Sequence, residues 1–199
     1  MAAVDAGCDA IGLNFFPDSI RYISTNIGLE IANSLPPFIS VVAVFANANQ
    51  TQIEEVLKTI PRINYYQFHG SVPDLDIIKN KPWIGILSID DSMSLDFVQK
   101  KLDSFSNQKI PPSIILVDTK SKGMFGGTGI PGPWELISKL NFNRPWILAG
   151  GLTPLNLAKA INVTNPYCVD VASGVENTLG EKCPIKMLDF VTNAVSNIS

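Results

Sequence analysis

Short apolar runs alternate with longer amphipathic segments along this 199-residue chain. Apolar runs of about four to eight residues between turn residues are typical of strands that are buried on both faces. Seven such runs predict strands, at residues 10–15, 40–46, 65–68, 83–89, 114–119, 146–149 and 168–172. Between them, apolar residues recur at helical spacing. These segments predict helices at residues 27–35, 49–60, 94–105, 134–140, 154–161 and 184–195.

This alternation of strands and helices predicts βαβ units and a parallel sheet. Residues 2–7 look like the end of a helix that Gly7 closes, so the strand that should precede this helix is missing. We therefore expect an α/β fold of the TIM (β/α)8 barrel type without its first strand. It forms a single domain over residues 1–199 that is incomplete at the N-terminus. An open barrel leaves two unpaired edges, so we expect these residues alone to be marginally folded or self-associated.

Asp118 stands at the end of the apolar run 114–117, and a loop ending in Gly126-Gly127-Thr128-Gly129 follows it. Parallel α/β proteins place their chemistry at the C-terminal ends of strands. Two interpretations fit this stretch equally well when it is taken alone. The carboxylate of Asp118 either meets a substrate or only steadies the loop.

Two later strand ends carry small residues, Gly150-Gly151 and Ser173-Gly174. Glycine lets a ligand approach the backbone closely, and the start of a helix offers free N–H donors. In α/β barrels the loops after the seventh and eighth strands often form a phosphate site. These two positions therefore favour a phosphate site over plain turns. Asp170 lies inside the last predicted strand, and we interpret it as a structural carboxylate of the barrel interior.

The composition narrows the function further. The net charge of −3 and the absence of a basic run give no support for nucleic-acid binding. No apolar stretch reaches the roughly 18 residues of a membrane span, and the N-terminus does not resemble a signal peptide. The three cysteines lack the spacing of a zinc site or a disulfide framework, and the single histidine excludes a multi-histidine metal site. We expect a cytoplasmic protein; the sequence sets no oligomeric state.

Several segments together carry a resemblance to a known family. They are Gln67-Phe68-His69-Gly70, Leu116-Val117-Asp118 with the loop 126–129, Leu148 to Asn156, and Val169 to Glu176. Ser19-Ile20-Arg21-Tyr22-Ile23 is similar to a Ser-Pro-Arg-Tyr-Val segment of the same family. Taken in this order, the segments closely resemble phosphoribosylanthranilate isomerase of tryptophan biosynthesis.

The resemblance implies a cofactor-free Amadori rearrangement of a small phosphorylated substrate, N-(5-phosphoribosyl)anthranilate, to 1-(2-carboxyphenylamino)-1-deoxyribulose 5-phosphate. It makes Asp118 the general acid and places Arg21 against the anthranilate carboxylate. Such an acid needs a pKa well above an ordinary aspartate's, which partial burial favours. The further substrate-binding residues that it implies are Gln67, His69, Gly127 and Thr128, with Gly150, Gly151, Ser173 and Gly174 at the phosphate and no metal. For Arg21 a surface ion pair, and for His69 a packed or loop-bonded ring, remain open alternatives.

The chain also departs from the family pattern. The family's general base is a cysteine in a Lys-Ile-Cys-Gly segment, and no such segment occurs here. Cys8 instead replaces an alanine before the second strand, Ala172 stands where serine is usual, and Cys183 replaces an aspartate. We therefore expect the chain as given to be inactive alone. One alternative is a non-catalytic, phosphate-binding barrel relic. The other is a different phosphosugar barrel enzyme. Such enzymes use catalytic lysines or metal ions at strand ends, whereas this chain has only Lys120 near a strand end and a single histidine.

Overall fold

The computed structural model describes residues 1–78, 81–120 and 133–198, and the chain divides into two compact units. The first unit comprises residue 1 and residues 8–84, and the second comprises residues 2–7 and the chain from residue 85 onward. The single domain over residues 1–199 stays a prediction. Each unit is built from strands and helices that alternate along the chain, which confirms the α/β class.

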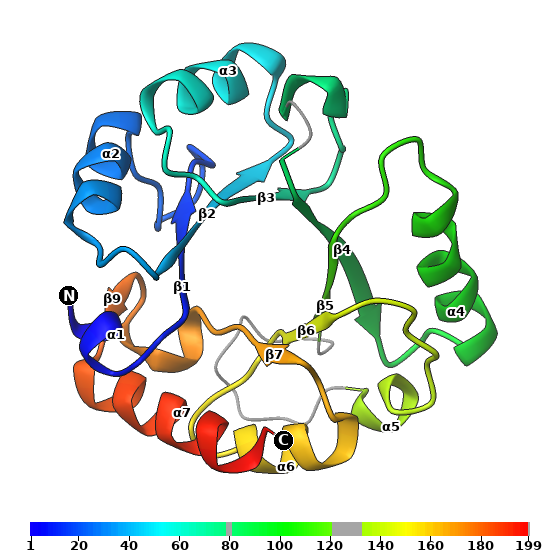
Figure 1. Ribbon diagram of the computed structural model, residues 1–199. Helices are drawn as coiled ribbons and strands as arrows, with labels where there is room; N and C mark the ends of the chain where they lie inside the picture. Colours follow the sequence, from blue (N-terminus) through cyan, green and yellow to red (C-terminus); the bar gives the residue numbers. More distant parts are fainter. Residues whose placement is uncertain (79–80, 121–132, 199) are drawn as a thin grey trace. The chain divides into compact units, whose positions relative to one another are not determined.

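Parallel strands in the order β1, β2, β3 and β4 form the sheet of the first unit. Helices α2 and α3 connect the first three strands and pack against each other (Figure 1). The elements are β1 (Ala10–Asn14), α2 (Thr25–Ser34), β2 (Ser40–Ala46), α3 (Gln50–Thr59), β3 (Tyr65–His69), the 3-10 helix η1 (Leu75–Ile78) and β4 (Trp83–Asp90), which runs on into the second unit.

A row of aromatic rings, which begins just after β1 and continues on β2, β3 and β4, belongs to the core of the first unit. The ring centroids of Phe15 and Phe45 lie 5.7 Å apart, and those of Phe45 and Phe68 lie 5.6 Å apart. Trp83 continues the row, 6.3 Å from Phe68. Each such pair contributes about 0.5–1.5 kcal/mol beyond the area that it buries. This row fixes the register of the strands, because a slip of one residue would turn every ring to the other face.

In the second unit β4 is followed by β5, β6 and β7, in this order across the sheet. Helix α7 packs on α6 and on the short α1 (Figure 1). The elements are α1 (Ala2–Asp5), α4 (Leu95–Ser104), η2 (Phe105–Asn107), β5 (Ile114–Lys120), α5 (Trp134–Ile137), β6 (Trp146–Ala149), α6 (Leu157–Thr164), β7 (Cys168–Val169), η3 (Ser173–Val175), β8 (Glu176–Thr178), β9 (Glu181–Lys182) and α7 (Pro184–Asn197).

The hydrophobic core of the second unit lies between its strands and its helices. Ile115, Val117 and Leu148 belong to it and are fully buried, together with Ile161 of α6 and Phe190 of α7. Side chains alternate between the two faces of a strand. Every second side chain of β5 and β6 therefore points towards the helices, and the side chains between them point to the opposite face of the sheet.

Local sequence signals set the helix boundaries as predicted in most cases. The side chain of Asn49 accepts the N–H of Gln52 and the Gln52 side chain accepts that of Asn49, a capping box at the start of α3. Ser94 caps α4 by accepting the N–H of Phe97. Each cap contributes about 1 kcal/mol to stability. Pro184 occupies the first position of α7, where its missing N–H costs nothing.

Three predicted elements differ most from the structure. Helix α6 begins at Leu157 and not at Pro154, although the N–H groups of Asn156 and Leu157 already bond to the Thr153 carbonyl oxygen in the turn before it. Helix α5 ends at Ile137 and not at Leu140. Strand β7 covers Cys168–Val169 alone and not residues 168–172. The N–H of Asp170 still bonds to the β6 carbonyl of Leu148, at 2.9 Å, and the chain then turns into η3.

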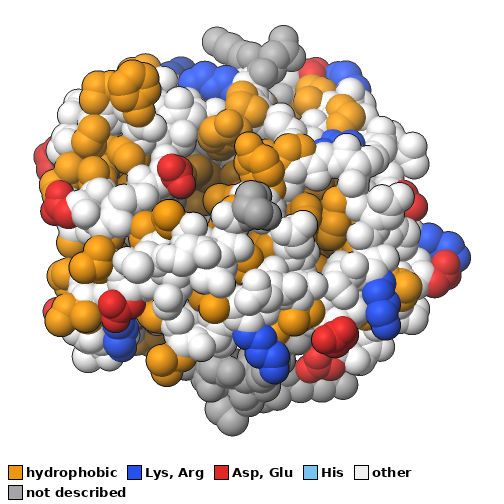
Figure 2. Space-filling view, turned by 60° about the horizontal axis from the view of Figure 1, so that its bottom comes forward, with side chains coloured by type: hydrophobic (Ala, Val, Ile, Leu, Met, Phe, Trp, Pro, Cys, Tyr) orange, Lys and Arg blue, Asp and Glu red, His pale blue; other side chains and the backbone are white. Residues whose placement is uncertain are grey.

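Charged side chains are scattered among apolar and neutral ones on the face shown in Figure 2. Neither sign gathers there into a continuous patch among the described residues. Within the described part of the chain, no helix is both long and apolar enough to cross a bilayer.

Candidate active site

Asp118 lies at the carboxyl end of β5 and is partly buried. Its neighbours Val117 and Thr119 point to the core side, so Asp118 projects from the opposite face of the sheet. Asp118 pairs with Ala149 of β6 in the parallel ladder. The structure thus places this carboxylate at the strand end where the sequence predicts it, next to the turn that carries Gly150.

Thr119 joins the end of β5 to the turn after β6. Its buried hydroxyl group lies 2.9 Å from the carbonyl oxygen of Gly150 and 3.2 Å from that of Ala149, and it donates its single proton to them. Gly150 has a φ of +89°, and a Cβ there would overlap the Thr119 backbone. Only glycine fits this position, which explains the first member of the Gly-Gly pair. The sequence analysis missed Thr119, because its role depends on a strand 30 residues away.

Gly151 differs from Gly150 in its surroundings. Its φ of +63° is also left-handed, but a Cβ there would meet no atom within 4 Å. Asn156 stabilises the turn, because its side-chain amide donates to the Gly151 carbonyl oxygen at 3.0 Å. The backbone at Gly151 therefore borders open space and is fixed in orientation. Both properties suit a backbone donor that faces a ligand.

The second predicted small-residue pair lies against this turn. A Cβ at Gly174 would overlap the carbonyl oxygen of Leu152, so the loop after β7 touches the loop after β6 through its backbone. Ser173 and Gly174 open the 3-10 helix η3, where the first N–H groups have no partner within the helix. The structure thus brings Gly150-Gly151 and Ser173-Gly174 together, as the sequence predicts.

A hairpin of β8 and β9 supports this loop through an ion pair that the sequence analysis did not predict. Lys182 Nζ lies 2.9 Å from Oε1 of Glu176, whose side chain is only 4% exposed. The same ammonium group donates to the carbonyl oxygen of Ala172 at 2.6 Å. The other oxygen of Glu176, Oε2, accepts the N–H of Gly180 at 3.1 Å. The ion pair therefore anchors the residue that precedes Ser173.

Asp170 lies just beyond the strand to which the sequence analysis assigned it. Protein atoms surround its carboxyl group, although part of the residue is exposed to solvent. Desolvation by the surrounding protein raises the pKa of Asp170, and the negative charge of Asp118 raises it further. Lys182 acts in the opposite direction and lowers this pKa. Asp170 is thus electrostatically coupled to Asp118, a relation that the interpretation as a purely structural carboxylate did not include.

The first unit contains the remaining described candidates. Arg21 lies, partly buried, in the loop after β1, and its N–H donates to the Ser19 hydroxyl at 3.1 Å. Asn14 fixes this loop by bonding Ser19 and the N–H of Phe16. This loop is therefore ordered by local bonds around a strand-end asparagine, and the guanidinium group is presented from a fixed backbone.

Gln67 and His69 form a bonded pair on β3. Gln67 is 8% exposed, and its amide nitrogen lies 2.8 Å from Nε2 of His69. The two side chains are therefore hydrogen-bonded to each other, and the tautomer of the ring sets which of them donates. His69 thus bonds to a side chain of its own strand, and its contact with the substrate stays a prediction. Gly127 and Thr128 lie outside the described residues.

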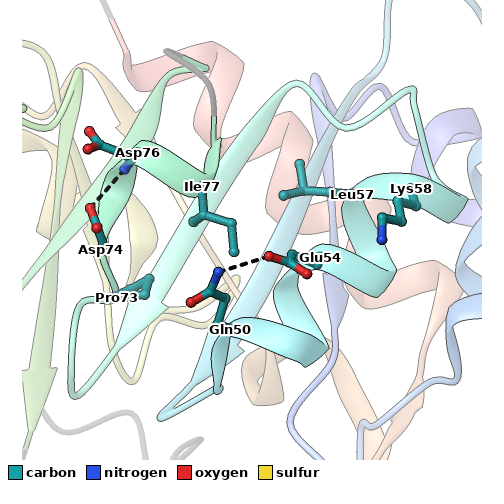
Figure 3. Close-up of a pocket in the computed structure, with 8 residues that line it drawn as sticks. All are labelled: Gln50, Glu54, Leu57, Lys58, Pro73, Asp74, Asp76 and Ile77. Atoms are coloured by element: carbon teal, nitrogen blue, oxygen red, sulfur yellow. Dashed lines mark hydrogen bonds between the residues drawn. The ribbon is translucent and has the colours of Figure 1, made fainter.

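A surface pocket of about 490 Å³ lies elsewhere in the first unit, between α3 and η1. Figure 3 shows Gln50 donating to Glu54, at 2.9 Å, and the backbone N–H of Asp76 donating to Asp74. The pocket contains none of the predicted site residues. Within the described residues, no group of three or more histidine, cysteine or acidic side chains is placed to hold a metal ion.

This site has an aspartate at the carboxyl end of a parallel strand and two glycine-bearing loops that touch each other. Such an arrangement is typical of α/β enzymes that act on small phosphorylated molecules. A family model described as N-(5'phosphoribosyl)anthranilate (PRA) isomerase matches residues 1–193. The chain belongs to this isomerase family.

Relatives of the same name support this assignment. The N-(5'-phosphoribosyl)anthranilate isomerase of Legionella pneumophila (strain Philadelphia 1) is 38% identical over 190 residues, which is 95% of this chain and 87% of the relative. The enzyme of Neisseria meningitidis serogroup C is 36% identical over 194 residues, 97% of this chain and 89% of the relative. These comparisons do not confirm the expectation that the chain is a copy without its first strand.

Solved structures give the same result for the fold. The phosphoribosyl anthranilate isomerase of Thermotoga maritima matches with a TM-score of 0.83 and 33% identity, over 98% of this chain and 92% of that one. A second structure of this isomerase, in complex with reduced 1-(o-carboxyphenylamino)-1-deoxyribulose 5-phosphate, matches with a TM-score of 0.76 and 30% identity, over 98% and 91% of the two chains.

Proposed function

We propose that this protein converts N-(5'-phosphoribosyl)anthranilate to 1-(2-carboxyphenylamino)-1-deoxyribulose 5-phosphate, an isomerisation in tryptophan biosynthesis. The observation that carries the proposal is the partly buried Asp118 at the end of β5, beside two touching glycine-bearing loops. The named relatives and the structure with a reduced phosphorylated ligand support the same substrate class. The reaction needs neither a cofactor nor a metal ion, because it only moves protons and opens one ring.

Asp118 is proposed as the general acid. Its proton passes to the ring oxygen of the ribose, the bond between that oxygen and C1 breaks, and a Schiff base forms with the anthranilate nitrogen. A base then removes the proton from C2, and the resulting enolamine becomes the ketone. Acid–base catalysis of this kind contributes about 10²–10⁴-fold to a rate. We assign the base to none of these 199 residues, because no Lys-Ile-Cys-Gly segment occurs among them.

The two glycine-bearing loops are proposed to bind the phosphate group. Gly151 borders open space, and Ser173 and Gly174 begin a helical turn, so their N–H groups suit an anion. Gly150 shapes the turn through its contact with Thr119. A phosphate held by backbone donors needs no cationic side chain.

The remaining roles rest on the family resemblance. Arg21 is proposed to bind the anthranilate carboxylate, which matches the planar fork of a guanidinium group. Gln67, His69, Gly127 and Thr128 are proposed as further substrate-binding residues. We also propose a TIM (β/α)8-type barrel in one domain as the fold, and a cytoplasmic location, which the free thiols of Cys8, Cys168 and Cys183 support.

A second candidate function is a non-catalytic barrel that binds the phosphorylated substrate. The lack of an assigned base favours it. Both candidates are tested by following the fluorescence of the substrate and, separately, the heat of binding of its reduced product analogue. Turnover and binding together support the isomerase. Binding without turnover supports the second candidate, and the absence of both would exclude the two.

A further inference from the structure

Three residues of the second unit lie in one row across neighbouring strands. Asp118 of β5 is paired with Ala149 of β6. Leu148, which precedes Ala149, is paired with Val169, so Asp170 comes next to Ala149 on the other side. The bond from the Asp170 N–H to the Leu148 carbonyl oxygen, at 2.9 Å, continues the parallel ladder to this point.

All three side chains project from the same face of the sheet. Val117, Leu148 and Val169 pack in or against the core on the helix side. Alternation therefore sends Asp118, Ala149 and Asp170 to the opposite face. Strands are spaced by about 4.8 Å, so the two aspartate α-carbons lie about 10 Å apart with one methyl group between them. Two carboxyl groups that extend from these positions over a methyl group come within range of direct electrostatic interaction.

Among the described residues, Asp118 and Lys182 are the charged groups that act on Asp170. Lys182 is the cation near Asp170, and it is already bound to Glu176 and to the Ala172 carbonyl oxygen. The pKa of Asp170 is raised in spite of this cation, first by desolvation and then by Asp118. Repulsion between two carboxylates is mutual, so a proton on either one stabilises the charge on the other.

We propose that Asp118 and Asp170 titrate as one pair across Ala149, and that Asp170 is a positioning residue that keeps a proton on this pair for delivery by Asp118. Proton delivery rests on the proposed isomerase function, whereas the pairing itself does not. A single aspartate has lost its proton well below neutral pH. A second carboxylate beside it keeps one proton bound to higher pH, which is what a general acid requires.

The test is a titration of the full chain with ¹³C-labelled aspartate carboxyl groups, followed by NMR. In the unmodified chain, the signals of Asp118 and Asp170 should share two titration steps. In Asp170→Asn and in Asp118→Asn, the remaining partner should titrate in a single step, about one pH unit below the upper step of the pair. Asp170→Glu should restore the second step. Asp189→Asn, on the exposed face of α7, is the matched control and should leave both signals unchanged.

Independent titration of the two groups, with Asp118 unaffected by Asp170→Asn, would overturn the proposal. A measurement of turnover distinguishes a failure of the proposed pairing from a failure of the proposed isomerase function. If the chain turns over the substrate, kcat should fall as the pH rises. This fall should begin about one pH unit lower in Asp170→Asn than in the unmodified chain, with little change in KM. Coupled titration without turnover would refute the isomerase function and leave the pair in place.

Discussion

Gly174 packs against the carbonyl oxygen of Leu152 so closely that any side chain at position 174 would overlap this oxygen. The contact is between two backbones, so no rotation of a side chain can relieve it. It ties the loop after β7 to the loop after β6 and fixes the spacing of the N–H groups to which we assign the phosphate.

Gly174→Ala should therefore reduce both stability and ligand binding. Because the backbone must shift, we expect the free energy of unfolding to fall by about 1–3 kcal/mol. The affinity for the reduced product analogue should fall by at least about tenfold, which corresponds to 1.4 kcal/mol. Urea unfolding and calorimetric titration measure the two effects. Gly12→Ala is the control, because a Cβ there would only touch Val44 at an ordinary 3.5 Å. Equal behaviour of both variants would contradict the assigned contact.

Gly151→Asp and Gly151→Asn form a matched pair that isolates charge at the proposed anion site. Both side chains enter open space, and both residue types tolerate the left-handed φ of +63° better than others do. The aspartate adds a negative charge next to the phosphate, so its variant should bind inorganic phosphate and the analogue at least about tenfold more weakly than the asparagine variant. Titration calorimetry at low salt measures the difference. The same affinity for both variants would exclude an anion beside Gly151.

Asp118→Asn should remove the proton donor and keep the shape of the site. Where turnover is measured, we expect kcat to fall by about 10²–10⁴-fold, while affinity for the reduced analogue stays within about tenfold. Asp90→Asn is the matched control, because Asp90 is also a carboxylate at a strand end and its side chain bonds the N–H of Ser92 in its own loop. A kcat for Asp118→Asn near that of the unmodified chain would remove Asp118 from the mechanism.

Asp170→Asn should stabilise the protein at neutral pH. The pKa of Asp170 is raised in the folded chain, so the charged carboxylate destabilises the fold once the pH exceeds that raised pKa. Below the ordinary value of 3.8 the group is protonated in both states, and the gain from the substitution should vanish. Because part of Asp170 is exposed to solvent, we expect a gain below about 1 kcal/mol. Urea midpoints at pH 7 and pH 3 test this sign, and a variant less stable than the unmodified chain at pH 7 would contradict it.

Local chemistry explains why so many boundaries could be predicted from sequence. Asn49 and Ser94 are caps whose partners lie three residues away, and Pro184 suits a first helical position by itself. Hydrophobic runs likewise locate the strands, since strands buried on both faces are mostly apolar. Pro154 lies in a turn that is closed by bonds to the Thr153 carbonyl oxygen, and the regular helix begins only at Leu157.

The support of the candidate site could not be predicted, because it consists of contacts between distant segments. The bond from Thr119 to Gly150 spans 31 positions in the sequence. The pair of Glu176 and Lys182 depends on a hairpin whose two short strands lack any periodic signal. Asp170 was assigned to a strand that ends before it. Residue types at strand ends thus indicate an acid and an anion site in the sequence. Which of these residues contact each other can be known only from the structure.

The bond between Thr119 and Gly150 has a consequence for how enzymes of this kind can change. Thr119 is the neighbour of the proposed acid, and Gly150 belongs to the turn assigned to the phosphate. A substitution that reshapes the turn to admit a different phosphate ester is therefore transmitted by one hydroxyl group to the strand that holds the acid. Evolution or engineering of substrate preference in this fold has to proceed by paired changes, with position 119 altered together with the turn that it holds.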